Sequence, residues 1–211
     1  MIGDDEMNSL VMPKRALLGV YDKTGVVELA KMLQECQVEL VSTGGTLNEL
    51  QKAGLKAVSI KDYTGRPEIL DGRVKTLQYE IHAGILYMRN NPQHVREMEE
   101  QKLKPIDMVV CNLYPFEQKI KEKGATFADC IENIDIGGPT MLAAAAKNWE
   151  GVAAVSNPHK YRTIALEVRN GGISRHTRWE LAVEARKRLA EYYAAISVWH
   201  NLNELTGPYT E

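Results

Sequence analysis

The feature that most restricts the fold of this chain is a regular alternation of short apolar runs with amphipathic segments from Pro13 onward. The apolar runs that we predict as strands lie at 16–20, 38–42, 56–60, 83–88, 106–113 and 152–156. The segments that we predict as helices between them lie at 26–33, 46–53, 92–102 and 140–147. Strands and helices in alternation are typical of helices packed on a parallel sheet. We therefore predict an α/β fold class, a compact, Rossmann-like parallel-sheet domain.

A second pattern follows the paired glycines at 171–172. From about Ser174 to Leu205 the sequence is wholly helical in pattern, with charged residues interleaved. Paired glycines favour a boundary between two structural units of a chain. We therefore predict an N-terminal extension over 1–12, an α/β domain over 13–170 and a C-terminal helical tail over 171–211. The apolar residues of the tail could pack on the body or on a second copy of the chain.

Charge and cysteine content exclude several functional classes. The chain has 26 Lys and Arg against 28 Asp and Glu, which argues against a dedicated binder of nucleic acid or of a membrane surface. Its 3 cysteines and 5 histidines show no spacing of a metal site or a nucleophilic triad. No apolar run has the length of a signal peptide or a membrane span. We expect a cytoplasmic protein with no metal, no nucleic-acid partner and no membrane partner.

Two glycine-containing loops follow the first two predicted strands. Thr43-Gly44-Gly45-Thr46 would open a helix, so its backbone N–H groups could point at an anion. Asp22-Lys23-Thr24-Gly25 follows the neighbouring strand, and parallel strands gather ligands at their carboxyl edge. The two loops together predict a phosphate site. The structural alternatives are a tight turn with Thr46 as a helix cap, and a helix capped by Asp22 or Thr24 with Lys23 solvated.

Polar residues at two further places could reach the same crevice. Arg73 and Lys75 lie two positions apart in the long polar segment 61–76, so both would point the same way on an extended backbone. An anionic substrate or transition state would be their partner, and a solvated basic pair is the alternative. Asn112 and Tyr114 end the most apolar strand. A purely structural Tyr114 fits that pattern equally well.

A carboxylate and a lysine flank the predicted helix at 140–147. Asp135 lies between two isoleucines and just before Gly137-Gly138, and a buried carboxylate needs a partner. If Lys147 folds back toward the crevice, the pair of Asp135 and Lys147 would tune a proton-transfer group. The alternative for Lys147 is a cation at a helix C-terminus.

Six blocks in this order resemble the IMP cyclohydrolase domain, the amino-terminal part of the bifunctional purine-biosynthesis proteins that also carry AICAR transformylase. The resemblance spans about 13–202, and its blocks are Asp22-Lys23-Thr24-Gly25, Ser42-Thr43-Gly44-Gly45-Thr46, Asp71-Gly72-Arg73-Val74-Lys75-Thr76-Leu77, Cys111-Asn112-Leu113-Tyr114-Pro115-Phe116, Ile134-Asp135-Ile136-Gly137-Gly138-Pro139-Thr140 and Ala144-Ala145-Ala146-Lys147-Asn148. The chain departs from the family at Gly19-Val20-Tyr21, where Ser-Val-Ser is usual. The resemblance implies a fold similar to that of methylglyoxal synthase.

The resemblance implies a hydrolase that closes 5-formamidoimidazole-4-carboxamide ribotide (FAICAR) to IMP, the last step of de novo purine synthesis, without a cofactor. It implies Lys147 as proton donor or acceptor, assisted by Lys75, Tyr114 and Asp135. The substrate-binding residues that it implies are Tyr21, Asp22, Lys23, Thr43, Gly44, Gly45, Thr46, Arg73, Val74, Thr76, Cys111, Asn112, Ile136 and Gly137. A homodimer is the implied assembly, and an AICAR transformylase encoded separately is a further possible partner.

Two other functions are compatible with the same fold. A non-catalytic nucleotide- or phosphate-sensing module needs only the phosphate loops, whereas Lys75, Asp135 and Lys147 together exceed that need. A methylglyoxal synthase is disfavoured because that family typically has His where this chain has Tyr21.

Overall fold

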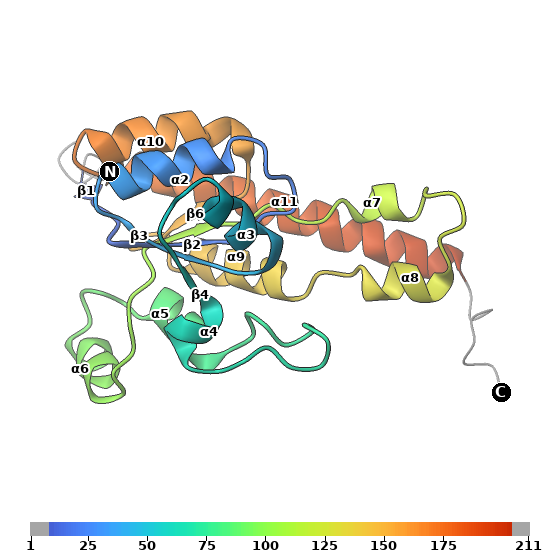
Figure 1. Ribbon diagram of the computed structural model, residues 1–211, viewed down its shortest axis with the longest axis horizontal. Coiled ribbons are helices and arrows are strands. Elements are labelled where there is room, and N and C mark those ends of the chain that lie inside the picture. The colour runs from blue at the N-terminus through green and yellow to red at the C-terminus, as the bar shows by residue number, and fades with distance from the viewer. Residues whose placement is uncertain (1–8, 204–211) are drawn as a thin grey trace, which may run out of the picture.

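The computed structural model describes residues 9–203, and its centre is a five-stranded parallel sheet (Figure 1). The strands are β2 (Arg15–Leu18), β3 (Glu39–Ser42), β4 (Ala57–Ser59), β5 (Met108–Val110) and β6 (Ala153–Val155). They lie in the order β4-β3-β2-β5-β6, and every neighbouring pair is parallel. The predicted α/β fold class is confirmed.

Each strand of the sheet lies within, or overlaps, one of the predicted apolar runs, but the run at 83–88 is not a strand. It belongs to helix α5 (Tyr79–Leu86), because an apolar run this short has the same pattern in a strand as in a buried helix. Gly84 explains the close packing of α5: a Cβ there would lie 2.6 Å from the carbonyl oxygen of Lys104. The prediction of a strand at 83–88 is therefore wrong.

Helices α2 (Val26–Glu35) and α10 (Tyr161–Arg169) lie side by side on one face of the sheet (Figure 1). The apolar side of α2 buries Leu29 and Leu33, and that of α10 buries Ile164, against strand residues such as Leu18. The sequence pattern predicted α2 but not α10. This layer brings the β2–α2 loop to the carboxyl edge of the sheet.

The other face is covered by α5, α9 (Gly137–Lys147) and α11 (Arg175–Leu202). Alanines of α9 and α11 pack against each other and against Val109 and Ala154 of the sheet, and their small side chains let the two helices approach closely. The far half of α11 extends past the sheet, where α7 (Phe116–Lys119) and α8 (Phe127–Glu132) pack on it (Figure 1).

The remaining described elements are α3 (Gly44–Lys52), α4 (Ile60–Thr64), α6 (Pro92–Glu100), the 3-10 helix η1 (Pro158–Lys160) and two short strands, β1 (Leu10–Val11) and β7 (Ile173–Ser174). Strands β1 and β7 pair antiparallel, away from the main sheet. Residues 1–8 of the expected N-terminal extension and 204–211 of the expected tail lie outside the described residues. Within 9–203, no helix is both long enough and apolar enough to cross a membrane.

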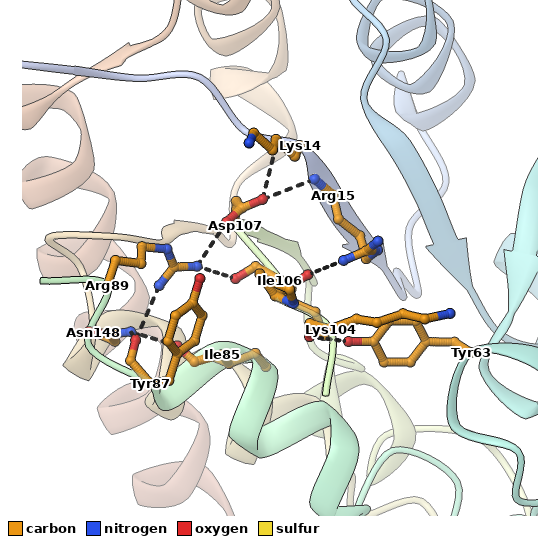
Figure 2. A network of polar contacts seen from close by, with 11 residues as sticks. Lys14, Arg15, Tyr63, Ile85, Tyr87, Arg89, Lys104, Ile106, Asp107 and Asn148 are labelled. Atoms are coloured by element: carbon orange, nitrogen blue, oxygen red, sulfur yellow. Dashed lines mark hydrogen bonds and ion pairs between the residues drawn. The ribbon is translucent and has the colours of Figure 1, made fainter. Parts of the chain in front are cut away.

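The buried carboxylate of Asp107 links strands at the amino end of the sheet through hydrogen bonds (Figure 2). Asp107 precedes β5, and its Oδ2 accepts from the backbone N–H groups of Lys14 and Arg15 at 2.9 and 3.0 Å. Its Oδ1 accepts from Arg89 Nη2 at 2.9 Å, and the same nitrogen donates to the carbonyl of Ile106 at 2.7 Å. Asp107 thereby joins β2, β5 and the segment after α5 at the end of the sheet opposite the carboxyl edge.

We expect Asp107→Ala to lower the free energy of unfolding by about 2–4 kcal/mol, because three donors lose their acceptor. Urea unfolding followed by circular dichroism measures this change. The matched control is Glu49→Ala, which removes an exposed ion pair with Lys52 and should change the free energy by less than about 0.5 kcal/mol. Equal effects of the two substitutions would show that Asp107 does not fasten the sheet.

Candidate active site

A pocket of about 700 Å³ opens at the carboxyl ends of β2, β3 and β5. Ligands of open parallel sheets bind at this edge. Five parts of the chain line the pocket: the loop that follows β2, the loop that follows β3, the segment 71–76, the segment that follows β5, and the connection from α8 into α9. The lining residues that the sequence predicted are Tyr21, Thr43, Gly45, Thr46, Arg73, Lys75, Thr76, Asn112, Tyr114, Asp135, Ile136 and Gly137.

One end of the pocket is built to hold an anion. Helix α3 begins at Gly44, and no side chain caps the N–H groups of its first turn. A Cβ at Gly45 would lie 3.3 Å from Lys23 Cε, and a Cβ at Gly44 would lie 3.5 Å from Lys75 Nζ. The helix dipole, the free N–H groups and two ammonium groups therefore meet at one place.

Two of the predicted ligand contacts that line the pocket, Thr46 and Asn112, also hold the loop that follows β2. Thr46 Oγ1 accepts from the N–H of Val20 and donates to its carbonyl, both at 3.0 Å. Asn112 Oδ1 accepts from the N–H groups of Tyr21 and Asp22 at 2.7 and 2.9 Å, and Asn112 Nδ2 donates to the carbonyl of Asp22 at 2.7 Å. These bonds fix the loop beside the anion site.

The structure contradicts the predicted alternative in which Asp22 or Thr24 caps α2: the N-cap residue is Gly25, and no side chain caps the helix. Asp22 Oδ1 instead accepts from the N–H of Thr24 at 2.9 Å in the turn before the helix, and hydrogen bonds from Thr24 lower the pKa of the Asp22 carboxyl. Asp22 lines a second hollow, of about 480 Å³, and does not line the pocket itself.

The segment 65–78 forms the wall opposite α3 and has an unusual backbone. Leu70, Asp71 and Gly72 are consecutive left-handed residues, with φ of 55°, 52° and 87°. The reversal that they make is closed by backbone pairing of Ile69 with Val74, so Val74 supports the segment and does not line the pocket.

The two cations of this segment that were predicted as site residues, Arg73 and Lys75, face carboxylates. Arg73 pairs with Glu132 of α8, and Lys75 Nζ lies 2.7 Å from Glu68. Neither carboxylate was predicted as part of the site. Glu68 lies in the same polar segment as Lys75, which is the only signal in the sequence that could have suggested it.

Asp135 lies against the first turn of α9 and lines the same pocket. Its Oδ1 accepts from the N–H of Gly138 at 2.8 Å. Burial raises the pKa of this carboxyl, and the N–H groups of Gly138 and Gly137 act in the opposite direction. A partly buried carboxylate with a raised pKa is a stronger base than a solvated one, which suits it to accepting and returning a proton.

The two glycines at the start of α9 make this arrangement possible. A Cβ at Gly138 would lie 2.2 Å from Asp135 Oδ2, and a Cβ at Gly137 would lie 2.3 Å from Thr76 Oγ1. Cys111 Sγ is also only 3.1 Å from the Cβ position of Gly138. Cys111 is buried beneath the pocket, and burial raises the pKa of its thiol, so it packs the site and does not line it.

The structure does not bring Lys147 into the pocket. Helix α9 runs unbroken from Gly137, next to Asp135, to Lys147, and ten residues of α-helix span about 15 Å. Lys147 is exposed, and its neighbour Asn148 donates to the carbonyls of Ile85 and Tyr87 near the amino end of the sheet (Figure 2). The predicted pairing with Asp135 is therefore corrected: backbone N–H groups of α9 are the partners of Asp135, and Lys147 is a cation at a helix C-terminus.

Two tyrosines form the wall between the pocket and the second hollow. The rings of Tyr21 and Tyr114 meet edge to face, with centroids 4.4 Å apart. Burial, followed by the proximity of Tyr21, raises the pKa of Tyr114. Its hydroxyl is consequently a neutral hydrogen-bond donor at the edge of the pocket. Tyr21, at a position that departs from the family pattern, thus takes part in the site through ring packing.

Comparisons with known proteins agree with this architecture. The family model described as MGS-like domain matches residues 25–140, and the model described as AICARFT/IMPCHase bienzyme matches residues 145–209. The chain is 50% identical over 187 residues to the Bifunctional purine biosynthesis protein PurH of Halalkalibacterium halodurans, and 49% identical over 187 residues to that of Bacillus mycoides (strain KBAB4). Each match covers 88% of this chain but 37% of the relative, so the chain spans just over a third of these relatives' length.

A solved structure, titled "Crystal structure of ForH", is similar with a TM-score of 0.77 and 34% identity. The match covers 89% of this chain and 98% of that one. The resemblance stated from the sequence motifs is confirmed by these matches. Because the first family model covers more than half of the chain and the fold agrees along almost the whole of a solved relative, the chain belongs to the MGS-like domain family.

Proposed function

We propose that the chain is an IMP cyclohydrolase, a hydrolase that interconverts FAICAR with IMP and water. The observation that carries the proposal is one pocket that combines an anion site at the start of α3 with the partly buried carboxylate of Asp135 before α9. The identity of about half of the residues to PurH and the match to the AICARFT/IMPCHase model support it. A purely sensing module is not favoured, because phosphate binding alone does not require a buried carboxylate.

The reaction needs proton transfers but no external reactant. The carboxamide nitrogen forms a bond to the formyl carbon and loses one proton, while the formyl oxygen gains one. The N–C bond closes the ring, and the resulting hydroxyl then leaves with the proton of the formamido nitrogen as water, so that a C=N bond forms within the ring. Because both reacting groups belong to one molecule, the protein has to fix their conformation, move the protons and stabilise charge on the oxygen.

The residues of the pocket suit these tasks. In this proposal the 5'-phosphate binds the first turn of α3 between Lys23 and Lys75, and the base reaches Ile136 and Gly137 at the start of α9. Asp135 accepts the carboxamide proton, because its pKa is raised by burial. Tyr114, a neutral donor at the same wall, hydrogen-bonds the developing oxygen charge.

We further propose that the protein is cytoplasmic and forms a homodimer. The support for both is the resemblance to the cyclohydrolase family, together with the near-neutral charge balance. An AICAR transformylase, which would supply FAICAR, is the functional partner that the bifunctional relatives suggest.

The direct test is a spectrophotometric assay of the purified chain with FAICAR, with Lys75→Met and Lys147→Met measured beside it. We expect the parent to form IMP. Lys75→Met should bind IMP about tenfold to a hundredfold more weakly, because the anion loses a charged partner. Lys147→Met should keep the parent affinity within about twofold, because Lys147 lies outside the pocket.

Three results would contradict parts of this proposal. IMP binding by the parent without turnover would support the sensing module instead. An unchanged affinity in Lys75→Met would remove Lys75 from the anion site. Loss of turnover in Lys147→Met with unchanged affinity would show that another copy of the chain or a rearrangement brings Lys147 to the reacting atoms.

A second test concerns the geometry at the start of α9. Gly138→Ala places a methyl group where Asp135 Oδ2 lies, so Asp135 must move away from the N–H of residue 138. We expect kcat to fall at least about tenfold, the effect of roughly one displaced catalytic group. The affinity for inorganic phosphate, which would bind the first turn of α3 and has no contact with Asp135 in this proposal, should stay unchanged.

The matched control for this variant is Ala143→Ser, an exposed position on the same helix, which should behave as the parent. Full activity of Gly138→Ala would show that the contact between Asp135 and the first turn of α9 is not needed for turnover.

A further inference from the structure

The Asp135 segment is held by a side chain from a distant part of the chain. The N–H of Asp135 donates to the hydroxyl of Tyr192, on α11, at 2.7 Å. Tyr192 is 7% exposed, so solvent does not readily replace this acceptor. The side-chain carboxylate of Asp135 accepts a hydrogen bond from the backbone N–H of Gly138. Asp135 is thus fixed at its backbone by α11 and at its side chain by α9.

We infer that Tyr192 is a positioning residue for Asp135 in the cyclisation reaction, which deepens the proposed function and rests on it. With the backbone N–H held, the carboxylate has one orientation toward the pocket. Without the hydroxyl, the N–H of Asp135 has to find another acceptor, and the connection between α8 and α9 can shift with it.

The ring of Tyr192 is itself fixed by an aromatic cluster. Tyr192 packs with Phe116, Cys130 and Trp199. Trp199 lies edge to face on Phe116, with centroids 5.4 Å apart, and stacks on Phe127 at 4.9 Å. Phe116 begins α7, just after Tyr114, and Phe127 begins α8, the helix that leads to Asp135. The far half of α11 therefore contacts the helices next to both proposed catalytic side chains, Tyr114 and Asp135.

The hydroxyl of Tyr192 has the protonation state that this role requires. Burial raises its pKa to about 12, against a smaller lowering by the hydrogen bond from Asp135. The group is therefore neutral at the pH of the reaction and brings no charge next to the carboxylate.

The test compares Tyr192→Phe with Tyr193→Phe, the exposed neighbour on the same helix. Tyr192→Phe keeps the ring in the aromatic cluster and removes only the hydroxyl. We expect kcat to fall about tenfold while KM for FAICAR stays within about twofold, as for the loss of one buried hydrogen bond that does not touch the substrate. In the Asp135→Asn background, the same substitution should have no further effect on kcat.

A second readout does not depend on turnover. Removal of the hydroxyl should speed hydrogen exchange of the Asp135 amide, measured by NMR, by about tenfold. Tyr193→Phe should leave both kcat and this exchange rate unchanged.

The outcomes separate the two proposals. If the parent forms no IMP, the proposed function fails, and the exchange rate still decides whether Tyr192 holds Asp135. If the parent is active and Tyr192→Phe has the parent kcat, the positioning role is overturned while the function stands. An equal fall in kcat in the Asp135→Asn background would also overturn it, because Tyr192 would then act on something other than Asp135.

Discussion

The absence of side chains at Gly137 and Gly138 is the constraint on which the site depends. The space that two Cβ atoms would fill is occupied by Thr76 from the segment opposite, by the carboxylate of Asp135 and by the thiol of Cys111 at the end of β5. The pocket wall, the buried acid and the sheet edge therefore meet at one helix terminus. No other residue type allows that meeting, because any Cβ would displace at least one of these groups.

The hydrogen bonds that stabilise the sheet and the residues that line the candidate pocket lie at opposite ends of the sheet. At the amino end, Asp107 and Arg89 hold strands together through a partly buried network of hydrogen bonds, which is costly to open (Figure 2). At the carboxyl end, the pair of Arg73 with Glu132 is exposed, and the pair of Lys75 with Glu68 is partly exposed. Exposed ion pairs contribute about 1 kcal/mol or less. An anionic ligand can therefore replace the carboxylate of Glu68 at Lys75 at little cost, while the sheet beneath stays unchanged.

The sequence predicted those parts of the structure that depend on local pattern. The five strands of the main sheet and the two phosphate-site loops are encoded by apolar runs and by glycines beside them. The run at 83–88 was assigned wrongly because only its tertiary surroundings, above all the carbonyl of Lys104 against Gly84, distinguish a buried helix from a strand there. Helix α10 (Tyr161–Arg169) has an apolar side, but no helix was predicted between 157 and 170.

Some of the site residues could likewise be predicted from local sequence pattern, and others could not. Lys75, Tyr114 and Asp135 lie on loops that parallel strands or a helix start bring to one edge, so their convergence follows from the topology. Lys147 does not lie at this edge, because it ends a helix that begins beside Asp135. With a rise of 1.5 Å per residue, the last residue of that alanine-rich helix lies far from the first. Tyr192 could not be predicted, because nothing local to α11 indicates Asp135, 57 residues away. The long helix is therefore more than a tail: an aromatic cluster at its far end contacts α7 and α8, the helices next to the two side chains on which the proposed ring closure depends.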